Sequence, residues 1–530
     1  MALEAFWLPL LPAYLIGLLA SWALEALLLP RPQAPWRRGA AANLTHVGVW
    51  TLAFALEMAL FQRPYFAIAN VLAIELLLVL VSRAKYEALQ EPFVYPDFEY
   101  FTDAIKHPRL YLPFFGWGKA LVCAGGYGVA LWGGLVLESA VTALPGGPDG
   151  ALLYSCLALL ALAGLACSVI AGRRLHATFD ADQDLRRLGF VAALWVYANA
   201  ERAPLDALLQ QAPFAGLHVP TVPGDQLPDL ISIQSESFFD VRSAYGIVRE
   251  DVLEGFDTLC NEAVAYGALH VAARGANTVR TEFAFLSGID PEKLGVHRYN
   301  PYRRLAGRGV PTLASHLRKL GYRTVCIHPY FASFYRRDKV LPKLGFDEFI
   351  DLRAFGQAEK VGAYVGDKAL AEYVIRMLSV RSDPRPLYVH VITMENHGPL
   401  HLEAVSAEAV NDVLTGPMPA GCADLVAYAR HIRNADAMFD MLRKHLSGNA
   451  RPASLCIFGD HVPVMPKVYR TLGDVPGNSH YVIWRNDAQK SGDSMDMSIA
   501  RLAQEFVASL FSGVSVSGCV VKQECNHPRL

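Results

Sequence analysis

The stretch DLISIQSES, residues 229–237, is a short apolar run that ends in polar side chains. Its length suits a buried strand, and an amphipathic helical pattern follows at 253–267. Similar apolar runs recur as YRTVCIH (322–328), LYVHVITM (387–394) and SLCIFGD (454–460). Strands that alternate with helices predict a C-terminal α/β domain, residues 229–530, with a mainly parallel central sheet.

Residues 1–175 have a different composition, typical of a membrane domain. The chain of 530 residues is 53% hydrophobic, and the apolar excess lies almost wholly in this part. Five runs approach the ~20 residues that cross a bilayer. They are residues 5–29, 44–61, 65–81, 112–144 and 151–171. Since the first run lacks the basic start of a cleaved signal peptide, we expect an α-helical transmembrane bundle of about five spans.

Two segments connect these parts. Residues 82–109 mix charges with Tyr and Phe, which predicts a helix on the membrane surface, with a plain loop as the alternative. Residues 176–228 read as a juxtamembrane helix followed by a linker, whose end, HVPTVPGDQLP, is rich in proline.

Charge and cysteine content exclude some functions. The net charge is -2 and no basic run is present, so nucleic acid is not an expected partner. The nine cysteines show no CxxC spacing, although Cys519 and Cys525 are close enough in sequence to pair.

Polar residues follow two of the expected strands directly. Glu236 comes after the first, and Asp460 and His461 come after the last. Taken singly, such residues are more often hydrogen-bonded loop residues than metal ligands. Because the carboxyl ends of parallel strands meet at one edge of a sheet, we expect them to converge on a divalent metal.

Thr278 lies in GANTVRTEFAFLSG, residues 275–288, where a Gly-led turn enters a helix. Its simplest role is to cap that helix. The alternative is a nucleophile, activated by the metal and the helix dipole, that attacks phosphorus. His328 and His397 also follow strands; His397 is a candidate proton donor to a leaving alkoxide, Arg337 a candidate phosphate ligand, and His390 a core histidine.

These motifs, with HPYFASFYRRDKVLPKLGFDEF (328–349), TMENHGPL (393–400) and FGDHVP (458–463), resemble the lipoteichoic acid synthase and phosphoglycerol transferase family. That family belongs to the alkaline phosphatase and sulfatase superfamily. In the N-terminal part the resemblance rests on the number of spans and on KYEALQEPFVYPDF, residues 85–98.

The resemblance implies a metal, usually Mn²⁺ or Mg²⁺ with Zn²⁺ as a further option, held by Glu236, Thr278, Asp460 and His461. Thr278 is then the nucleophile. It also implies that glycerol phosphate is surrounded by four residues, which are His328, Tyr335, Arg337 and His397. The family often has Trp at the position of Tyr335 and Asn at that of Arg336, and these departures bear on the acceptor.

The implied activity is transfer of glycerol phosphate from phosphatidylglycerol to an envelope or periplasmic glycan. A sulfatase reaction is disfavoured, because no CxPxR-like or SxPxR-like motif surrounds Thr278. A phosphoethanolamine transferase is the main alternative, although its usual disulfides fit the sparse cysteines poorly. A phosphodiesterase and a non-catalytic membrane sensor also stay open.

The sequence gives two opposing expectations for the side of the membrane on which the C-terminal domain lies. Basic residues cluster on one side of the bundle, and five spans place the C-terminal domain on that same side, which the positive-inside rule makes cytoplasmic. The basic residues on this side are Arg31, Arg37, Arg38, Arg83, Lys85, Arg173 and Arg174. The resemblance implies instead a bacterial cytoplasmic-membrane protein whose catalytic domain faces the periplasm or the outside, and we adopt that orientation.

Overall fold

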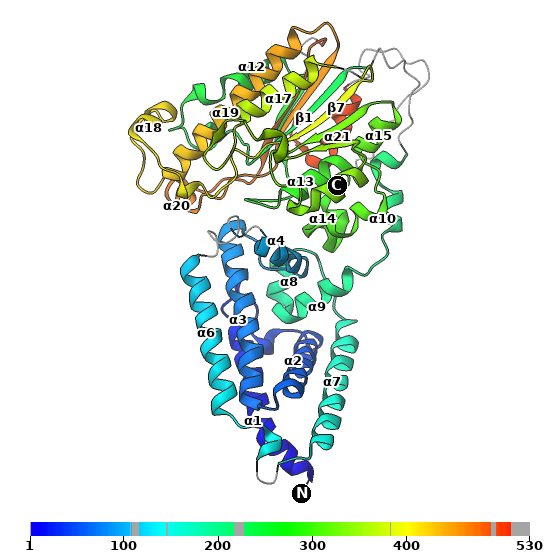
Figure 1. Cartoon of the computed structure of the whole chain (residues 1–530), viewed down its shortest axis with the longest axis vertical. Helices are drawn as coiled ribbons and strands as arrows, with labels where there is room; N and C mark the ends of the chain where they lie inside the picture. The colour runs from blue at the N-terminus through cyan, green and yellow to red at the C-terminus, as the bar shows by residue number, and fades with distance from the viewer. Residues whose placement is uncertain are drawn as a thin grey trace, which may run out of the picture.

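The computed structural model describes residues 2–106, 108, 116–144, 147–216, 227–381, 383–488 and 494–509. A helical bundle lies at one end of the molecule and an α/β domain at the other (Figure 1). This architecture confirms the expected fold class. Cys519 and Cys525 lie outside the described residues.

Five long helices form the bundle in the described part of residues 1–175. They are α1 Ala2–Glu25, α2 Ala40–Phe61, α3 Pro64–Leu89, α6 Trp117–Leu137 and α7 Gly150–Gly172. Among the described residues, four stretches are long and apolar enough to cross a membrane: Ala40–Phe61, Pro64–Leu89, Ala120–Ala143 and Gly150–Gly172. The other expected span is α1, whose apolar stretch Leu10–Glu25 is shorter than these four.

Helices α2 and α7 pack closely because glycines face each other across their contact. A methyl group built on Gly164 would lie 2.7 Å from the carbonyl oxygen of Gly48. Larger side chains at these two positions would push the helices apart.

Residues 82–109 differ from the expected single surface helix. Helix α3 continues to Leu89, and η2 Tyr95–Glu99 and α4 Tyr100–Lys106 follow between the bundle and the α/β domain (Figure 1). The reason is that the aromatic side chains pack on protein; Phe93 is buried with Leu28, Leu185 and Phe190. The rest of the connection is α8 Ala181–Leu188, α9 Phe190–Ala200, α10 Asp206–Gln210 and η4 Pro213–Ala215, and residues 217–226 lie outside the description.

An eight-stranded sheet forms the centre of the α/β domain, in the order β10-β2-β9-β8-β1-β7-β3-β4. Its strands are β1 Asp229–Ser235, β2 Ala265–His270, β3 Arg323–Ile327, β4 Glu348–Ile350, β7 Leu387–Ile392, β8 Ala453–Gly459, β9 Ser479–Arg485 and β10 Met497–Ser498. Of these strands β9 alone runs against its neighbours. A two-stranded ribbon is separate, β5 Lys360–Val361 with β6 Tyr364–Val365.

Helices cover both faces of the sheet (Figure 1). One apolar core lies beneath α12 Glu254–Glu262, α17 Asp367–Ser379 and α19 Ala423–Ser447. The other lies beneath α13 Thr278–Ser287, α15 Leu313–Lys319 and α21 Ile499–Ala508. The shorter helices are α11 Val241–Ala244, α14 Pro301–Arg304, α16 Arg337–Val340, α18 Ala407–Val413 and α20 Pro466–Leu472.

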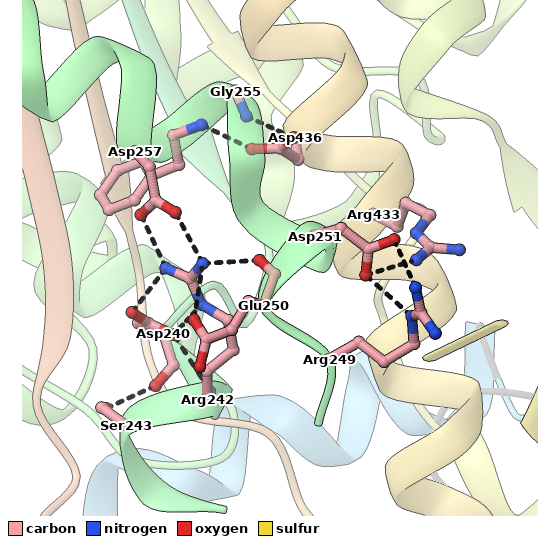
Figure 2. A network of polar contacts seen from close by, with 11 residues as sticks. Asp240, Arg242, Ser243, Arg249, Glu250, Asp251, Gly255, Asp257, Arg433 and Asp436 are labelled. Carbon is pink, nitrogen blue, oxygen red and sulfur yellow. Dashed lines mark hydrogen bonds and ion pairs between the residues drawn. The ribbon is translucent and has the colours of Figure 1, made fainter. Parts of the chain in front are cut away.

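Polar contacts fasten α12 and the preceding η5 Glu250–Leu253 to α19 (Figure 2). Asp436 accepts hydrogen bonds from the backbone N–H groups of Gly255 and Phe256, at 2.9 and 2.6 Å. Arg433 pairs with Asp251 at 3.2 Å. Since the first N–H groups of a helix have no partner within it, Asp436 satisfies the start of α12 and fixes its packing.

Candidate active site

Three expected metal ligands meet at the carboxyl ends of neighbouring strands β1 and β8. One ligand atom from each of Glu236, Asp460 and His461 lies within 4.8 Å of the other two. His461 Nε2 is 3.6 Å from Glu236 Oε1 and 3.5 Å from Asp460 Oδ2. All three side chains are buried.

The chemistry of this triad fits a divalent cation. Asp460 Oδ2 is buried and has no hydrogen-bond partner among the described residues. Burial, and after it the Asp460 carboxylate, raise the pKa of Glu236 to about 7, which means that the protein alone opposes two negative charges here. A cation held by these residues would satisfy the free oxygen and offset that repulsion.

Residues around the triad orient its ligands. Ser237 donates its backbone N–H to Asp460 Oδ1 at 2.8 Å and its hydroxyl to Glu236 Oε1 at 2.9 Å. Thr393 accepts the Glu236 N–H at 2.9 Å, and the Asn396 amide donates to the Glu236 carbonyl at 3.2 Å. The sequence interpretation missed these three roles. Ser237 is next to Glu236, Asn396 is next to His397, and Thr393 lies in the same motif as His397.

Thr278 is the first residue of α13, and the N-cap is Asn277 in the left-handed conformation with φ 65°. Thr278 is therefore not the cap. The segments on either side of it are tied to the triad loop: Gly275 N–H donates to the Val462 carbonyl at 3.0 Å, and the Thr281 hydroxyl donates to the Asp460 carbonyl at 2.7 Å. These ties hold the start of α13 against the loop that carries Asp460 and His461, with Thr278 at the positive end of the helix dipole.

His397 contributes an imidazole to the same place. Its Nδ1 lies 2.8 Å from the Gly398 carbonyl oxygen, which accepts the Nδ1–H and leaves the lone pair on Nε2. Burial lowers the pKa of His397, against the opposing effect of that hydrogen bond. The imidazole is therefore neutral near pH 7.

The other expected substrate residues divide into two groups. Tyr335 lines the cavity described below, in a left-handed conformation with φ 52° that non-glycine residues rarely adopt. His328 and Arg337 are buried behind it. Arg337 donates to Glu282 Oε2 at 2.6 Å and to His328 Nε2 at 3.2 Å, and its guanidinium lies 5.3 Å from the centre of the Tyr335 ring. The sequence interpretation missed Glu282.

His390 is fully buried in strand β7, where it contacts the Ser232 hydroxyl at 2.8 Å.

A cavity of about 1800 Å³ joins this site to the bundle. Glu236, Thr278 and His461 lie on its wall together with His397 and Tyr335. The bundle supplies an apolar wall from α3 and α6, which includes Leu76, Leu77, Leu80, Val122 and Ala130. Polar residues of the α/β domain line a further part, among them Arg274, His401, Lys467 and Arg470.

Residues 228–512, more than half of the chain, match the family model for sulfatases. The chain belongs to the sulfatase family. Membership of this family does not by itself name a reaction.

Among similar proteins, this sulfatase-family chain is 28% identical over 465 residues to the capsular polysaccharide biosynthesis protein RkpI of Rhizobium meliloti, covering 83% of this chain and 81% of that one. It is 24% identical over 161 residues to lipoteichoic acid synthase 1 of Bacillus subtilis, covering 30% and 24%. This second match confirms the resemblance found from the motifs.

The fold extends to the membrane part of a solved structure. The integral membrane lipooligosaccharide phosphoethanolamine transferase A of Neisseria meningitidis superposes over 94% of both chains, with a TM-score of 0.53 and 13% identity. At that identity the match supports the shared architecture of bundle and α/β domain.

Proposed function

We propose that this protein is a membrane-anchored, metal-dependent phosphoglycerol transferase. It moves glycerol phosphate from phosphatidylglycerol to an envelope glycan, with Thr278 as the residue that carries the group. The observation that supports this most is the cavity, whose wall holds Thr278 and the triad at one place and apolar side chains of α3 and α6 at another. A donor with acyl chains and a phosphodiester matches both walls.

The ligands are Glu236, Asp460, His461 and the Thr278 hydroxyl. Three of these four ligands donate through oxygen, which suits a hard or borderline ion. Mn²⁺ is the first choice, and Mg²⁺ and Zn²⁺ are the alternatives. When bound, the ion lowers the pKa of the threonine hydroxyl and offsets charge on the phosphoryl oxygens.

The chain's own residues then carry two steps. Thr278 gives its hydroxyl proton to His397 Nε2 and its Oγ1 forms a bond to phosphorus, while the bond to the diacylglycerol oxygen breaks and His397 returns the proton to that oxygen. In the second step an acceptor hydroxyl attacks phosphorus and gives its proton to His397 Nε2, the bond to Thr278 breaks, and His397 passes the proton to the Thr278 oxygen. The neutral imidazole, held by the Gly398 carbonyl, is suited to accept that proton.

Tyr335 lies on the cavity wall where the glycerol phosphate would sit. Arg337 and His328 act through it in this proposal, because Glu282 holds Arg337 behind the Tyr335 ring. The acceptor would approach from the polar part of the cavity, which suits the hydroxyl-rich surface of a glycan. The catalytic domain then faces the periplasm or the outside, where both substrates meet.

A phosphoethanolamine transferase is the second candidate, since one such enzyme shares the architecture over 94% of the chain. Full-length protein in nanodiscs, supplied with Mn²⁺, separates the two candidates. We expect diacylglycerol release from phosphatidylglycerol and transfer of labelled glycerol phosphate to an oligosaccharide. Release from phosphatidylethanolamine alone would replace the proposal by the second candidate, and release without transfer to any glycan would indicate a phosphodiesterase.

A further inference from the structure

The segment KYEALQEPFVYPDF, residues 85–98, lies between the bundle and the α/β domain and carries a charged cluster. Lys85 Nζ contacts Glu91 Oε1 and Asp97 Oδ2, each at 2.6 Å. Asp97 also accepts the Val94 N–H at 2.8 Å. The turn after α3 is thus held in one conformation by its own charges, with Glu91 directed at the neighbouring domain.

Glu91 binds the helix that begins with the nucleophile. Arg280 donates through Nη1 to Glu91 Oε2 at 2.7 Å and through Nη2 to Glu91 Oε1 at 2.9 Å. Its Nε donates to the Tyr299 carbonyl at 3.1 Å, and its guanidinium lies 5.0 Å from the centre of the Tyr299 ring. A paired, forked contact of this kind fixes direction as well as distance.

This contact is protected from water. The side chains of Arg280 and Glu91 are 5% and 20% exposed. Burial opposes ionisation of Glu91, but Arg280 and Lys85 lower its pKa below the usual value, so the carboxylate is charged. Removal of one partner of such a largely buried pair costs more than removal of one partner of a surface pair, because it leaves the other charge unpaired.

We propose that Glu91 is a positioning residue for the nucleophile. Arg280 lies two residues after Thr278 in the first turn of α13, and Glu91 lies two residues after the end of α3, which lines the apolar wall of the cavity. The pair therefore fixes the Thr278 hydroxyl relative to the place where the acyl chains of the donor lie. This inference rests on the proposed role of Thr278.

The chain offers a matched control at the same boundary. Arg303 pairs with Glu99 at 3.2 Å and with Glu201 at 3.4 Å. Arg303 lies in α14 and Glu99 in η2, so this pair is not part of the helix that begins with Thr278. If an ion pair here serves only to attach the two domains, Glu91→Gln and Glu99→Gln should have similar effects.

The test measures diacylglycerol release from labelled phosphatidylglycerol by the full chain in mixed micelles, at several mole fractions of lipid. We expect Glu91→Gln to lower kcat by about 10- to 100-fold with little change in KM, because small displacements of a reacting group are costly. Glu99→Gln should leave both constants near those of the unsubstituted protein. Arg280→Gln in the Glu91→Gln background should cost much less than it does alone, since the two residues act as a unit.

Three outcomes would overturn the inference: an unchanged kcat in Glu91→Gln, an equal loss in Glu99→Gln, or losses from Glu91→Gln and Arg280→Gln that multiply. Thermal unfolding of each variant separates a folding defect from a positioning defect. If Glu91→Gln does not fold, Glu91→Asp replaces it, since it keeps the charge and shortens the reach; wild-type kcat in that variant also contradicts the inference. Absence of release by the unsubstituted protein would refute the proposed function itself.

Discussion

Arg337 is a buried positive charge beside the proposed active site. Its side chain is 1% exposed, and the Glu282 carboxylate that faces it is fully buried. Tyr302 also donates its hydroxyl to Glu282. An ionised guanidinium in such a place is tolerated only while its partner remains, because removal of one member leaves a buried charge unpaired.

We therefore expect Glu282→Gln to destabilise the α/β domain strongly, by about 3–5 kcal/mol. The matched control is Glu505→Gln, which removes a pair with Arg501 on the surface of α21. That change should cost less than about 1 kcal/mol. Chemical denaturation in detergent measures both, and equal small losses would show that Arg337 does not depend on Glu282.

The candidate site could be predicted at the positions where polar residues follow apolar runs. Glu236, Asp460 and His461 stand at strand ends, and parallel strands bring their ends together. Glu282 was missed, although a single acidic residue inside TEFAFLSG is a signal of a buried pair. The burial of Arg337 depends on tertiary packing, which local sequence does not report.

At the level of elements, the loop after β7 is fastened to α19. His431 of α19 contacts Glu395 Oε1 through Nδ1 at 3.0 Å and Glu403 Oε1 through Nε2 at 2.9 Å. Glu395 lies two residues before His397. Burial disfavours the charged imidazole, yet the hydrogen bonds to Glu395 and Glu403 raise the pKa of His431 to about 9.

This link predicts a pH-dependent stability. Because the pKa of about 9 in the folded protein exceeds the value near 6.5 of an unfolded histidine, the stabilisation is fully present below pH ~6.5. It is lost as the pH rises through ~9. The thermal midpoint of the unsubstituted protein should fall over this range, and His431→Gln should show a lower midpoint with a smaller fall. Parallel curves for the two proteins would contradict the assignment.

Elements with a strong hydrophobic period or a long apolar run could be predicted from the sequence, and the junction between the two domains could not. The runs 44–61 and 151–171 correspond to α2 and α7 within a few residues. Residues 82–109 have the composition of a membrane-surface helix, but a protein surface offers their aromatic side chains the same apolar environment that a bilayer does. Composition cannot distinguish the two.

For the whole molecule, the structure shows the contacts of some of the seven basic residues on which the expected orientation depends. Arg38 pairs with the buried Glu25, Lys85 pairs with Glu91 and Asp97, and Arg83 donates to the Leu27 carbonyl at 2.9 Å. The positive-inside rule counts Lys and Arg and gives Asp and Glu little weight, so these contacts leave the two expectations for the orientation opposed. Two of the seven basic residues, Arg38 and Lys85, are paired with carboxylates.

We expect the catalytic domain outside the cytoplasmic membrane. A β-lactamase fused to the C-terminus should protect cells from ampicillin, since that enzyme acts only outside the cytoplasm. A fluorescent protein at the same position should stay dark if it is exported unfolded. A bright fusion without ampicillin resistance would place the domain in the cytoplasm, where the proposed glycan acceptor is absent.

The central claim is that Thr278 carries the transferred group. The most direct measurement is mass spectrometry of the peptide that contains residues 275–288, after full-length protein has been mixed with phosphatidylglycerol and Mn²⁺ and quenched in acid. We predict glycerol phosphate on Thr278, and neither the adduct nor diacylglycerol release in Thr278→Ala. Undiminished diacylglycerol release by Thr278→Ala, or an adduct on another residue, would contradict the account.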